Sequence, residues 1–327
     1  MRSVAVVGTG LIGTSIGLAL RGRGVTTYLI DIDPEAARTA AELGAGIAGS
    51  PREPVDLAVV AVPPRYVAAT LREHQLRVLA HDFTDVASVK EQVQQEAARA
   101  GCDLTRFVGG HPMGGREQSG PLAASADLFH GRPWVLTPTS QTRAQTVERA
   151  RNLAELCGAR PVVMTQAEHD QAVALVSHTP HLVSSLLAAR LLQGEQSQLG
   201  LAGQGLRDVT RLAGGSPELW TDILGTNAVA VADVLAEFSH DVGLMVDTLR
   251  TMGTARKPEQ GSASRDRLAS VLLRGVQGRA RIPACSTGST GGAGLGTGGA
   301  GLNADGAGLS TGGAGLSTDY ATAPGRV

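Results

Sequence analysis

The 327-residue sequence is poor in aromatic residues, which make up 3% of it, although 42% of it is hydrophobic. Its cores must therefore be built mainly from Ala, Val and Leu. The sequence also lacks an excess of charge of either sign, because 29 basic and 30 acidic residues give a formal net charge of -1. This balance gives no electrostatic reason to expect nucleic acid or an anionic membrane as a partner.

Cysteines are also few: Cys102, Cys157 and Cys285. Their odd number and their spacing match neither a disulfide framework nor a zinc site, which favours a reducing cytoplasm. The N-terminus leads at once into a short strand-like run and lacks the longer apolar region and cleavage site of a secretory signal. No run of residues is expected to reach the length of a membrane-spanning helix. We therefore expect a cytoplasmic protein with no membrane partner.

The first half of the sequence alternates β-rich runs with helical patterns. The predicted strands cover 3–7, 26–31, 56–62, 78–86, 107–111, 133–137 and 160–164. Helical patterns lie between them, for example at 11–21, 34–43, 89–100 and 141–156. This alternation predicts an α/β domain of the Rossmann type, with a doubly wound parallel sheet covered by helices on both faces.

The pattern changes near residue 166. From there to about residue 281 the sequence indicates helix, in runs at 166–192, 217–251 and 262–277, and Pro180 is expected to kink the first run. We predict a dinucleotide-binding domain over 1–165 and an all-α domain over 166–282. The length of the helical half and its Ala, Leu and Val content suit a dimerisation surface.

The last part of the chain, 283–327, is rich in Gly, Ala, Ser and Thr. The tetrad Gly-Ala-Gly-Leu recurs at 292, 299, 306 and 313. Each glycine in a helix costs about 1 kcal/mol relative to alanine, and one Leu per heptad is too few for a coiled-coil seam. We therefore expect a disordered, flexible tail without a core of its own.

A glycine-rich run, Gly8-Thr9-Gly10-Leu11-Ile12-Gly13, lies between the first predicted strand and the first helical pattern. In that context its spacing is typical of a dinucleotide-binding turn. Gly8 permits the tight turn, Gly10 lets the backbone approach a pyrophosphate, and Gly13 lets the helix pack close to the strand. The helix N-terminus then faces the phosphates with unpaired N–H groups. The alternative is a glycine-rich turn without a ligand.

Asp31 ends the second predicted strand. A carboxylate there accepts hydrogen bonds from the adenosine ribose and repels a 2′-phosphate, which favours NAD over NADP. Asp33 is a substitute candidate for this role. The alternative is a surface aspartate.

The run Asp85-Val86-Ala87-Ser88-Val89-Lys90 ends the fourth predicted strand. Because ligands of doubly wound sheets bind at the carboxyl ends of strands, Ser88 is placed to meet the nicotinamide or the substrate. Its alternative role, compatible with the first, is to cap a helix beginning at Val89. Lys90 is expected on the surface of that helix rather than in catalysis.

His111 lies in an unusual loop, residues 109–121, that directly follows a predicted strand. We expect it to project at the end of that strand near Ser88, where the neighbouring glycines leave room for a ligand. An imidazole titrates close to neutral pH and can take a proton from an alcohol as hydride leaves the same carbon. The alternative is a structural histidine in a tight loop.

Two further pairs lie in the helical half. His178 and His181 share a helix face, and we expect them to face a substrate because Pro180 bends the helix there. A metal pair is the alternative, but no other ligand cluster supports it. Arg207 and Arg211 also share a face, and Asp208 is placed to bond Arg211. An arginine held in this way suits bidentate binding of a carboxylate, whereas a surface ion pair is the alternative.

These motifs, in this order, make the chain resemble the prephenate/arogenate dehydrogenase family of tyrosine biosynthesis. The resemblance runs from about residue 3 to about residue 275 and rests on the segments 8–13, 85–90, 111–121, 177–181 and 207–220. It implies an NAD-dependent oxidative decarboxylation, in which hydride leaves the ring carbon that bears the hydroxyl and the ring loses CO2 and becomes aromatic. The product would be 4-hydroxyphenylpyruvate from prephenate, or tyrosine from arogenate.

The resemblance also implies roles for single residues. His111 matches the family histidine that accepts the hydroxyl proton. Ser88 matches the serine that orients the hydroxyl and the nicotinamide, and Arg211 matches the arginine that holds a substrate carboxylate. Further residues are expected to contact the substrate: His178, His181, Arg207 and Glu117. The family's fold implies a homodimer formed through the helical domain.

The loop after His111 departs from the family pattern. Gly114, Arg116 and Gln118 replace the Ala, Thr and Lys that relatives commonly carry there. The charge changes at the last two positions could alter which substrate side chain is preferred.

Two other hypotheses fit parts of the sequence. One is a two-domain dehydrogenase that acts on a β-hydroxyacid or an imine. The helical domain of such enzymes often supplies a catalytic lysine. The only lysine in the helical half here is Lys257, which lies in a polar loop. The other is a non-catalytic NAD(H)-sensing protein, which would keep the glycine-rich turn and Asp31 without needing His111 or Arg211.

Overall fold

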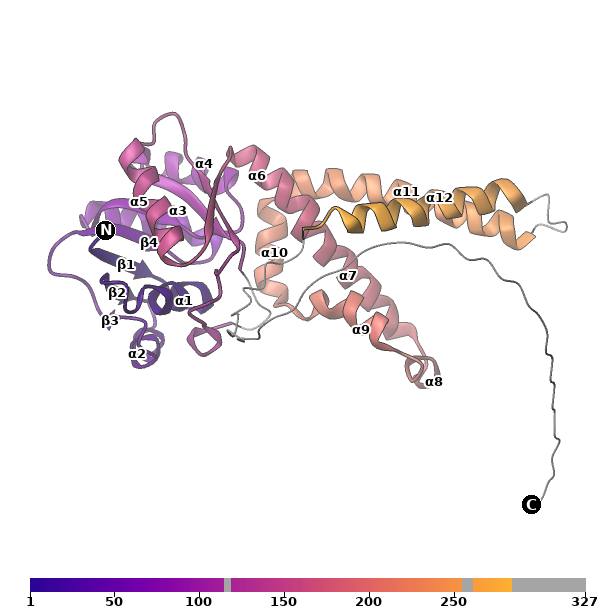
Figure 1. The fold of residues 1–327 in the computed structure, drawn as a ribbon, viewed down its shortest axis with the longest axis horizontal. Helices are drawn as coiled ribbons and strands as arrows, with labels where there is room; N and C mark the ends of the chain where they lie inside the picture. The colour runs from indigo at the N-terminus through magenta and orange to yellow at the C-terminus, as the bar shows by residue number, and fades with distance from the viewer. Residues whose placement is uncertain (115–118, 255–260, 284–327) are drawn as a thin grey trace, which may run out of the picture. The chain divides into compact units, whose positions relative to one another are not determined.

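The computed structural model describes residues 1–114, 119–254 and 261–283. Its N-terminal half carries one eight-stranded sheet in the order β3-β2-β1-β4-β5-β6-β7-β8 (Figure 1). The strands are β1 (Ser3–Val7), β2 (Thr26–Ile30), β3 (Ile47–Ala48), β4 (Val55–Val60), β5 (Ala80–Asp85), β6 (Phe107–Pro112), β7 (Pro133–Thr137) and β8 (Arg160–Val163). The parallel strands step outward from β1 in both directions, which confirms the doubly wound α/β prediction.

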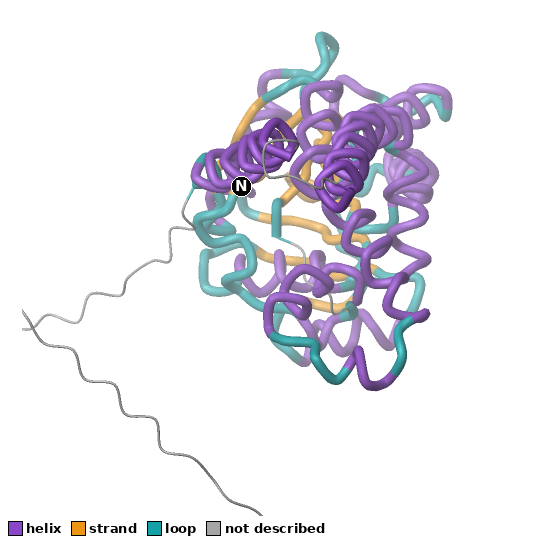
Figure 2. Tube along the Cα trace, turned by 90° about the vertical axis from the view of Figure 1, so that its right-hand side faces the viewer, coloured by secondary structure: helices purple, strands orange, loops and turns teal. Residues whose placement is uncertain are grey.

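Helices cover both faces of the sheet, so that the strands lie between them in Figure 2. They are α1 (Leu11–Leu20), α2 (Pro34–Glu42), α3 (Pro64–Leu76), α4 (Glu91–Arg99) and α5 (Ala144–Leu156). Along β1, Val4 and Val6 join the apolar cluster that includes α1 and α5, whereas Ala5 and Val7 join the cluster that includes α3. Because both of its faces are buried, β1 is an apolar run after Ser3, without alternation.

Two features of the sheet differ from the sequence prediction. The strand β3 has only two residues, too few to give a periodic signal. The sequence predicts a wholly parallel sheet, but β7 is antiparallel to β6, with His111 opposite Val135. The described part of the connection between them holds only a short 3-10 turn, Pro121–Ala123. An antiparallel neighbour needs no crossover helix, whereas a parallel one does.

The segment after β8 is helical, as predicted. Helix α6 (Gln166–Val173) continues through a π-helical stretch, Ala174–His178, into α7 (Thr179–Arg190). Proline removes an N–H and crowds the preceding turn, and the wider π stretch just before Pro180 accommodates it without a break. The other helices of this half are α8 (Gln196–Leu199), α9 (Gln204–Thr210), α10 (Pro217–Thr226), α11 (Ala228–Thr254) and α12 (Ser262–Ala280).

The continuous helix corrects one expectation from the sequence. The run Gln166–Gln193 has 28 residues and is long and apolar enough, by length and composition, to cross a membrane. From the sequence no run of this length is expected, and the helix continues through Pro180. Core helices of proteins outside membranes meet the same test. This helix carries six buried polar side chains: His169, Asp170, His178, Thr179, His181 and Ser184.

A break occurs where one helix, 217–251, is predicted. Asn227 ends α10 with φ -111° and ψ 29°, and α11 begins at the next residue. The buried Asn227 side chain donates from Nδ2 to the backbone oxygen of Asp170 at 2.8 Å, so the break ties these helices to α6. On α10, Trp220 and Ile223 pack with apolar residues of the nucleotide half. The tail predicted over 283–327 lies outside the described residues, apart from its first residue.

Candidate active site

The glycine-rich turn follows β1 and opens α1, as predicted. Gly8 has φ +104°, and a Cβ there would lie 2.3 Å from the backbone oxygen of Ala61. A Cβ on Gly13 would lie 1.9 Å from the backbone oxygen of Gly8, so only glycine lets α1 pack this close to the turn. At Gly10 the added Cβ would meet nothing within 4 Å. This open space lies where a pyrophosphate would approach the N-terminus of α1.

Asp31 follows β2, and its carboxylate binds the same turn. Its Oδ2 accepts hydrogen bonds from the backbone N of Thr9 at 2.6 Å and from Thr9 Oγ1 at 2.8 Å, and its Oδ1 accepts from the backbone N of Asp33 at 2.9 Å. Asp31 therefore fastens the turn to the end of β2, a role that the sequence does not suggest. A carboxylate offers about four acceptor positions, so a contact with a ribose hydroxyl is compatible with these three bonds.

Lys90 is buried, contrary to the expectation that it lies on a helix surface. Its Nζ lies 2.7 Å from Oδ1 and 2.8 Å from Oδ2 of Asp85, and it donates to the backbone oxygen of Gly110 at 2.6 Å. The side chains of Lys90 and Asp85 are 1% and 0% exposed. Burial raises the pKa of Asp85 and lowers the pKa of Lys90, and the ion pair opposes both shifts. The pair joins the end of β5 to the end of β6.

Two glycines make room for this ion pair beside His111. A Cβ on Gly110 would lie 2.6 Å from the backbone oxygen of Asp85, and a Cβ on Gly109 would lie 3.2 Å from Cδ of Lys90. These glycines therefore let strand β6 lie close to the ion pair. Their role before His111 is in packing, which the sequence does not predict.

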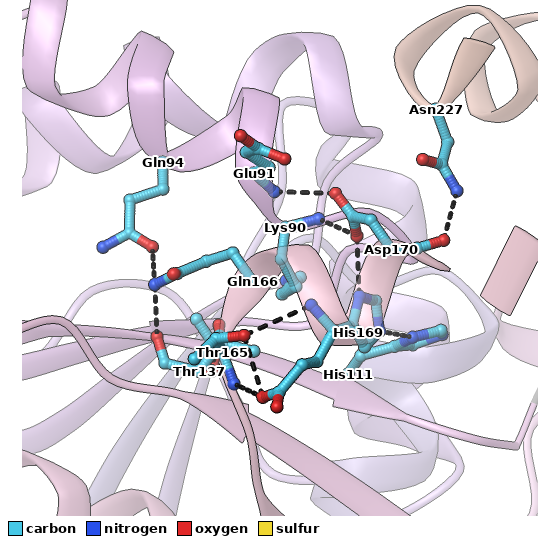
Figure 3. Close-up of polar contacts among 12 residues, drawn as sticks. Lys90, Glu91, Gln94, His111, Thr137, Thr165, Gln166, His169, Asp170 and Asn227 are labelled. Atoms are coloured by element: carbon cyan, nitrogen blue, oxygen red, sulfur yellow. Dashed lines mark hydrogen bonds and ion pairs between the residues drawn. The ribbon is translucent and has the colours of Figure 1, made fainter. Parts of the chain in front are cut away.

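Ser88 lies half-buried in the loop between β5 and α4. Its predicted role as a helix cap is wrong, because α4 begins at Glu91. The backbone N of Lys90 donates to Oδ1 of Asp170, and the backbone N of Glu91 donates to Oδ2, both at 2.9 Å. A carboxylate from α6 therefore caps α4 and joins the helical half to the nucleotide half (Figure 3).

His111 lies at the end of β6 and contacts α6 (Figure 3). Its Nδ1 is 2.8 Å from Nε2 of His169, and Nδ1 of His169 is 2.7 Å from Oδ1 of Asp170. The two imidazole rings meet edge to face. Sequence reasoning misses His169 and Asp170. Their only local signal is the capping box of Thr165 and Glu168, which starts a helix directly after the last strand.

The surroundings of His111 keep its imidazole neutral. Burial, and then the neighbouring His169, Lys90 and His178, lower the pKa of His111 well below its usual value of about 6.5. Neutral imidazole can accept a proton, whereas imidazolium cannot. His111 is therefore in the form that a general base requires.

The pH dependence of catalysis should show this shift. A base is active when deprotonated, so kcat/KM should stay level as the pH falls from about 8 to about 6.5 and should decline only at lower pH. Initial rates measured across this range, with the fold checked by circular dichroism at each pH, provide the test. A single-proton decline centred above about 6.5 would contradict the lowered pKa of His111.

His178 and His181 are both buried, in the π-helical stretch and in α7. Nδ1 of His178 accepts from Nδ2 of Asn227 at 3.1 Å, so neutral His178 carries its proton on Nε2. Burial is the largest cause that lowers the pKa of His178 to about 4. His181 stacks on Trp220, with 3.5 Å between ring centroids. Among the described residues, no group of three or more His, Cys, Asp or Glu is arranged to hold a metal ion.

The predicted arginines lie on the surface. Arg207 is in α9, and Arg211 opens the 3-10 turn Arg211–Gly214. Gly215 directly follows this turn and lies close to the histidines. A Cβ there would lie 2.6 Å from Nε1 of Trp220 and 3.1 Å from Cε1 of His181. The last predicted substrate contact, Glu117, lies outside the described residues.

The fold and the site together define a class: a two-domain oxidoreductase with an NAD-type dinucleotide site. Comparison with protein families gives the particular group. The family model for the nucleotide-binding domain of prephenate dehydrogenase matches residues 16–163, and the model for the prephenate dehydrogenase dimerization domain matches residues 165–260. The chain belongs to the prephenate dehydrogenase family.

Individual relatives agree with this family. The chain is 45% identical over 288 residues to a probable prephenate dehydrogenase, NovF, from Streptomyces niveus, covering 86% of this chain and 78% of that protein. The crystal structure of prephenate dehydrogenase from A. aeolicus, in complex with hydroxyphenyl propionate and NAD+, matches with a TM-score of 0.73 and 25% identity over 85% of this chain and 98% of that one. Synechocystis arogenate dehydrogenase matches with a TM-score of 0.69 and 28% identity, over 85% and 99%.

Proposed function

We propose that this protein catalyses the NAD-dependent oxidative decarboxylation of prephenate to 4-hydroxyphenylpyruvate. The observation that carries the proposal is the position of His111 at the carboxyl end of β6, on the same edge of the sheet as the glycine-rich turn after β1. Ligands of doubly wound sheets bind at this edge. The relatives support the substrate class, because NovF is described as a probable prephenate dehydrogenase and the A. aeolicus enzyme binds hydroxyphenyl propionate with NAD+.

In this proposal His111 takes the proton of the substrate hydroxyl while hydride leaves the same carbon for the nicotinamide. Loss of CO2 then makes the ring aromatic, which makes the overall step effectively irreversible. Ser88 orients the hydroxyl, and Arg211 binds a carboxylate with its guanidinium fork. Further residues are proposed to contact the substrate: His178, His181, Arg207 and Glu117.

NAD is proposed as the cofactor in preference to NADP. The glycine-rich turn, 8–13, binds the pyrophosphate, and Asp31 at the end of β2 accepts from the ribose hydroxyls. The carboxylate of Asp31 would repel the 2′-phosphate of NADP. The carboxylate of Asp31 also accepts hydrogen bonds from Thr9 in the turn. Replacement of Asp31 should therefore weaken the binding of both NAD and NADP and also reduce the preference for NAD.

We further propose a cytoplasmic homodimer formed through a helical domain that starts near residue 165. The family model over residues 165–260 is described as a dimerization domain. The helical half exposes large apolar side chains, including Leu186, Leu187, Phe238, Leu272 and Leu273. Sedimentation velocity of the purified chain tests the proposal, and a monomer at micromolar concentration would contradict it.

The test of the function is an NADH assay with prephenate and with arogenate, each supplied with NAD or NADP. Arogenate is the second candidate substrate, favoured by the similarity to Synechocystis arogenate dehydrogenase. The expected result is the highest kcat/KM with prephenate and NAD. A higher value with arogenate would select the second candidate. Cofactor binding without turnover of either substrate would instead favour the non-catalytic sensor.

Replacing Arg211 by Ala should mainly weaken substrate binding. A hydrogen bond to a charged group contributes about 1.5–3 kcal/mol, so KM should rise about 10-fold to 100-fold while kcat changes much less. The matched control is Arg250→Ala, because Arg250 on α11 is 78% exposed and pairs only at the surface. A KM equal to that of the control would contradict the carboxylate-binding role of Arg211.

A further inference from the structure

We propose that His169 and Asp170 are positioning residues that hold His111 in the tautomer whose Nε2 accepts the substrate proton. The proposal rests on the base role of His111 proposed above. It starts from a continuous chain of three side chains, in which 2.8 Å separates the two imidazoles and 2.7 Å separates His169 from Asp170 (Figure 3). The roles of donor and acceptor along this chain follow from its last member.

Asp170 is ionised and can only accept. Burial opposes its ionisation, but hydrogen bonds from His169 and from the backbone N of Glu91 and of Lys90 outweigh burial and lower the pKa of Asp170. Nδ1 of His169 must therefore be the donor in its contact with Oδ1 of Asp170. A neutral imidazole has a single N–H, so Nε2 of His169 is left with a lone pair.

That lone pair decides the tautomer of His111. Since Nε2 of His169 can only accept, Nδ1 of His111 must carry the proton, and Nε2 of His111 is free to act as the base. When Nε2 takes the substrate proton, Nδ1–H of the new imidazolium still donates to His169. The negative charge of Asp170 then lies one ring away from the positive charge on His111. In a Ser-His-Asp triad a buried carboxylate fixes the tautomer of the basic histidine directly, whereas here the carboxylate acts through His169.

The opposite arrangement would inactivate the base. If His169 gained a second proton, its Nε2–H would donate to Nδ1 of His111, and the proton of His111 would move to Nε2. Lys90 and His178 face His111 and lower its pKa, while Asp85 pairs with Lys90. A proton added to either imidazole therefore leaves Nε2 of His111 without a free lone pair, and this removes the base.

Asp170 also holds the hydrogen-bonded row His111–His169–Asp170 in place. Its two oxygens cap α4 through the backbone N of Lys90 and of Glu91, and its own backbone oxygen accepts from Asn227. The carboxylate is thus fixed by elements from both halves of the molecule. A fixed carboxylate orients His169, and the oriented ring fixes His111 in turn.

The tautomer can be measured without substrate. The chain has eight histidines, and ¹⁵N-histidine labelling with long-range ¹H–¹⁵N spectra reports which ring nitrogen carries the proton. The signals missing from His111→Asn identify His111. At a pH of about 8, where histidine is neutral, the expected result is a proton on Nδ1 and a lone pair on Nε2. A proton on Nε2 of His111 would overturn the proposal, even in an enzyme that oxidises prephenate.

The kinetics of two His169 variants provide a second test of the proposal. His169→Leu removes the acceptor, and kcat should fall about 10-fold to 100-fold, as for other groups that orient a functional side chain. His169→Gln places an amide oxygen near the former Nε2, so it should keep Nδ1–H of His111 engaged and recover part of the loss. A purely structural His169 would give two variants with equal kcat, and this result would overturn the proposal. NADH binding by both variants checks that they fold.

The substitution Asp170→Asn tests whether the negative charge of Asp170 is needed. The amide keeps the size of the side chain but offers no negative charge, so kcat should fall about 10-fold to 100-fold and His111 should lose its single tautomer. The matched control is Asp82→Asn, because Asp82 is also buried and hydrogen-bonds Thr146 Oγ1 at 2.6 Å, among residues outside the proposed site. Equal losses of kcat in the two variants would mean that Asp170 acts only through stability.

The spectra and the kinetics separate this proposal from the proposed function. If prephenate and arogenate are both inert, the spectra still decide the tautomer of His111. If prephenate is turned over but the tautomer is wrong, the function stands and the positioning role fails.

Discussion

Replacement of His111 by Asn is expected to lower kcat by about two to four orders of magnitude, while the Kd for NADH changes less than about threefold. Asparagine can still hydrogen-bond a hydroxyl, but it cannot take up its proton. His111 lies at the end of β6 with its pKa lowered by burial and by neighbouring His169, Lys90 and His178. The loss should therefore fall on the proton-transfer step, and binding of the dinucleotide at the turn after β1 should be spared.

The measurement is a pair of titrations, one of initial rate against prephenate and one of protein fluorescence against NADH. His240→Asn is the matched control, because His240 is exposed on α11. If His111→Asn keeps the kcat of the control, His111 is not the base. If it loses NADH binding to the same extent as kcat, the residue serves the fold of the site rather than proton transfer.

The sequence predicts those parts of the site that are local along the chain. The glycine-rich turn is recognisable because its three glycines act within one strand-turn-helix unit, and the geometry at Gly8 and Gly13 bears out their packing roles. The position of His111 is predictable because residues at the carboxyl ends of parallel strands share an edge. Each of these inferences needs only neighbouring residues and the rule for the sheet.

The parts that the sequence does not predict depend on long-range pairing. Lys90 has the pattern of a surface helix residue, and only the approach of Asp85 and Gly110 makes its burial favourable. His169 and Asp170 lie 58 and 80 residues from the groups that they bind, His111 and the backbone N of Lys90. No periodicity or motif specifies contacts of that kind, because they arise from the packing of α6 against the strand ends.

The sequence does not predict the direction of β7 either, for a related reason. The sequence of β7 is an apolar run, which fits a buried strand of either direction. The antiparallel pairing with β6 places Trp134 opposite Pro112. The composition of an apolar run does not fix that register.

Replacement of Lys90 by Met is expected to lower the free energy of unfolding by about 3–5 kcal/mol. Methionine fills a similar volume, but it leaves the fully buried carboxylate of Asp85 without its cation and the backbone oxygen of Gly110 without its donor. Removing one partner of a buried ion pair costs more than the pair itself contributes, because the remaining charge stays desolvated. Urea unfolding followed by circular dichroism measures the change.

Two further measurements make the Lys90 prediction specific. Lys90→Met combined with Asp85→Leu removes both charges and should recover most of the lost stability, since an apolar pair carries no desolvation penalty. The single variant should also lose less stability at acid pH. Burial already raises the pKa of Asp85, and loss of Lys90 raises it further, so the folded state gains a proton before the unfolded state does. The penalty is therefore complete above the folded pKa and shrinks as the pH falls through it. A single variant as stable as the double variant at pH of about 7 would show that Asp85 does not carry a buried charge.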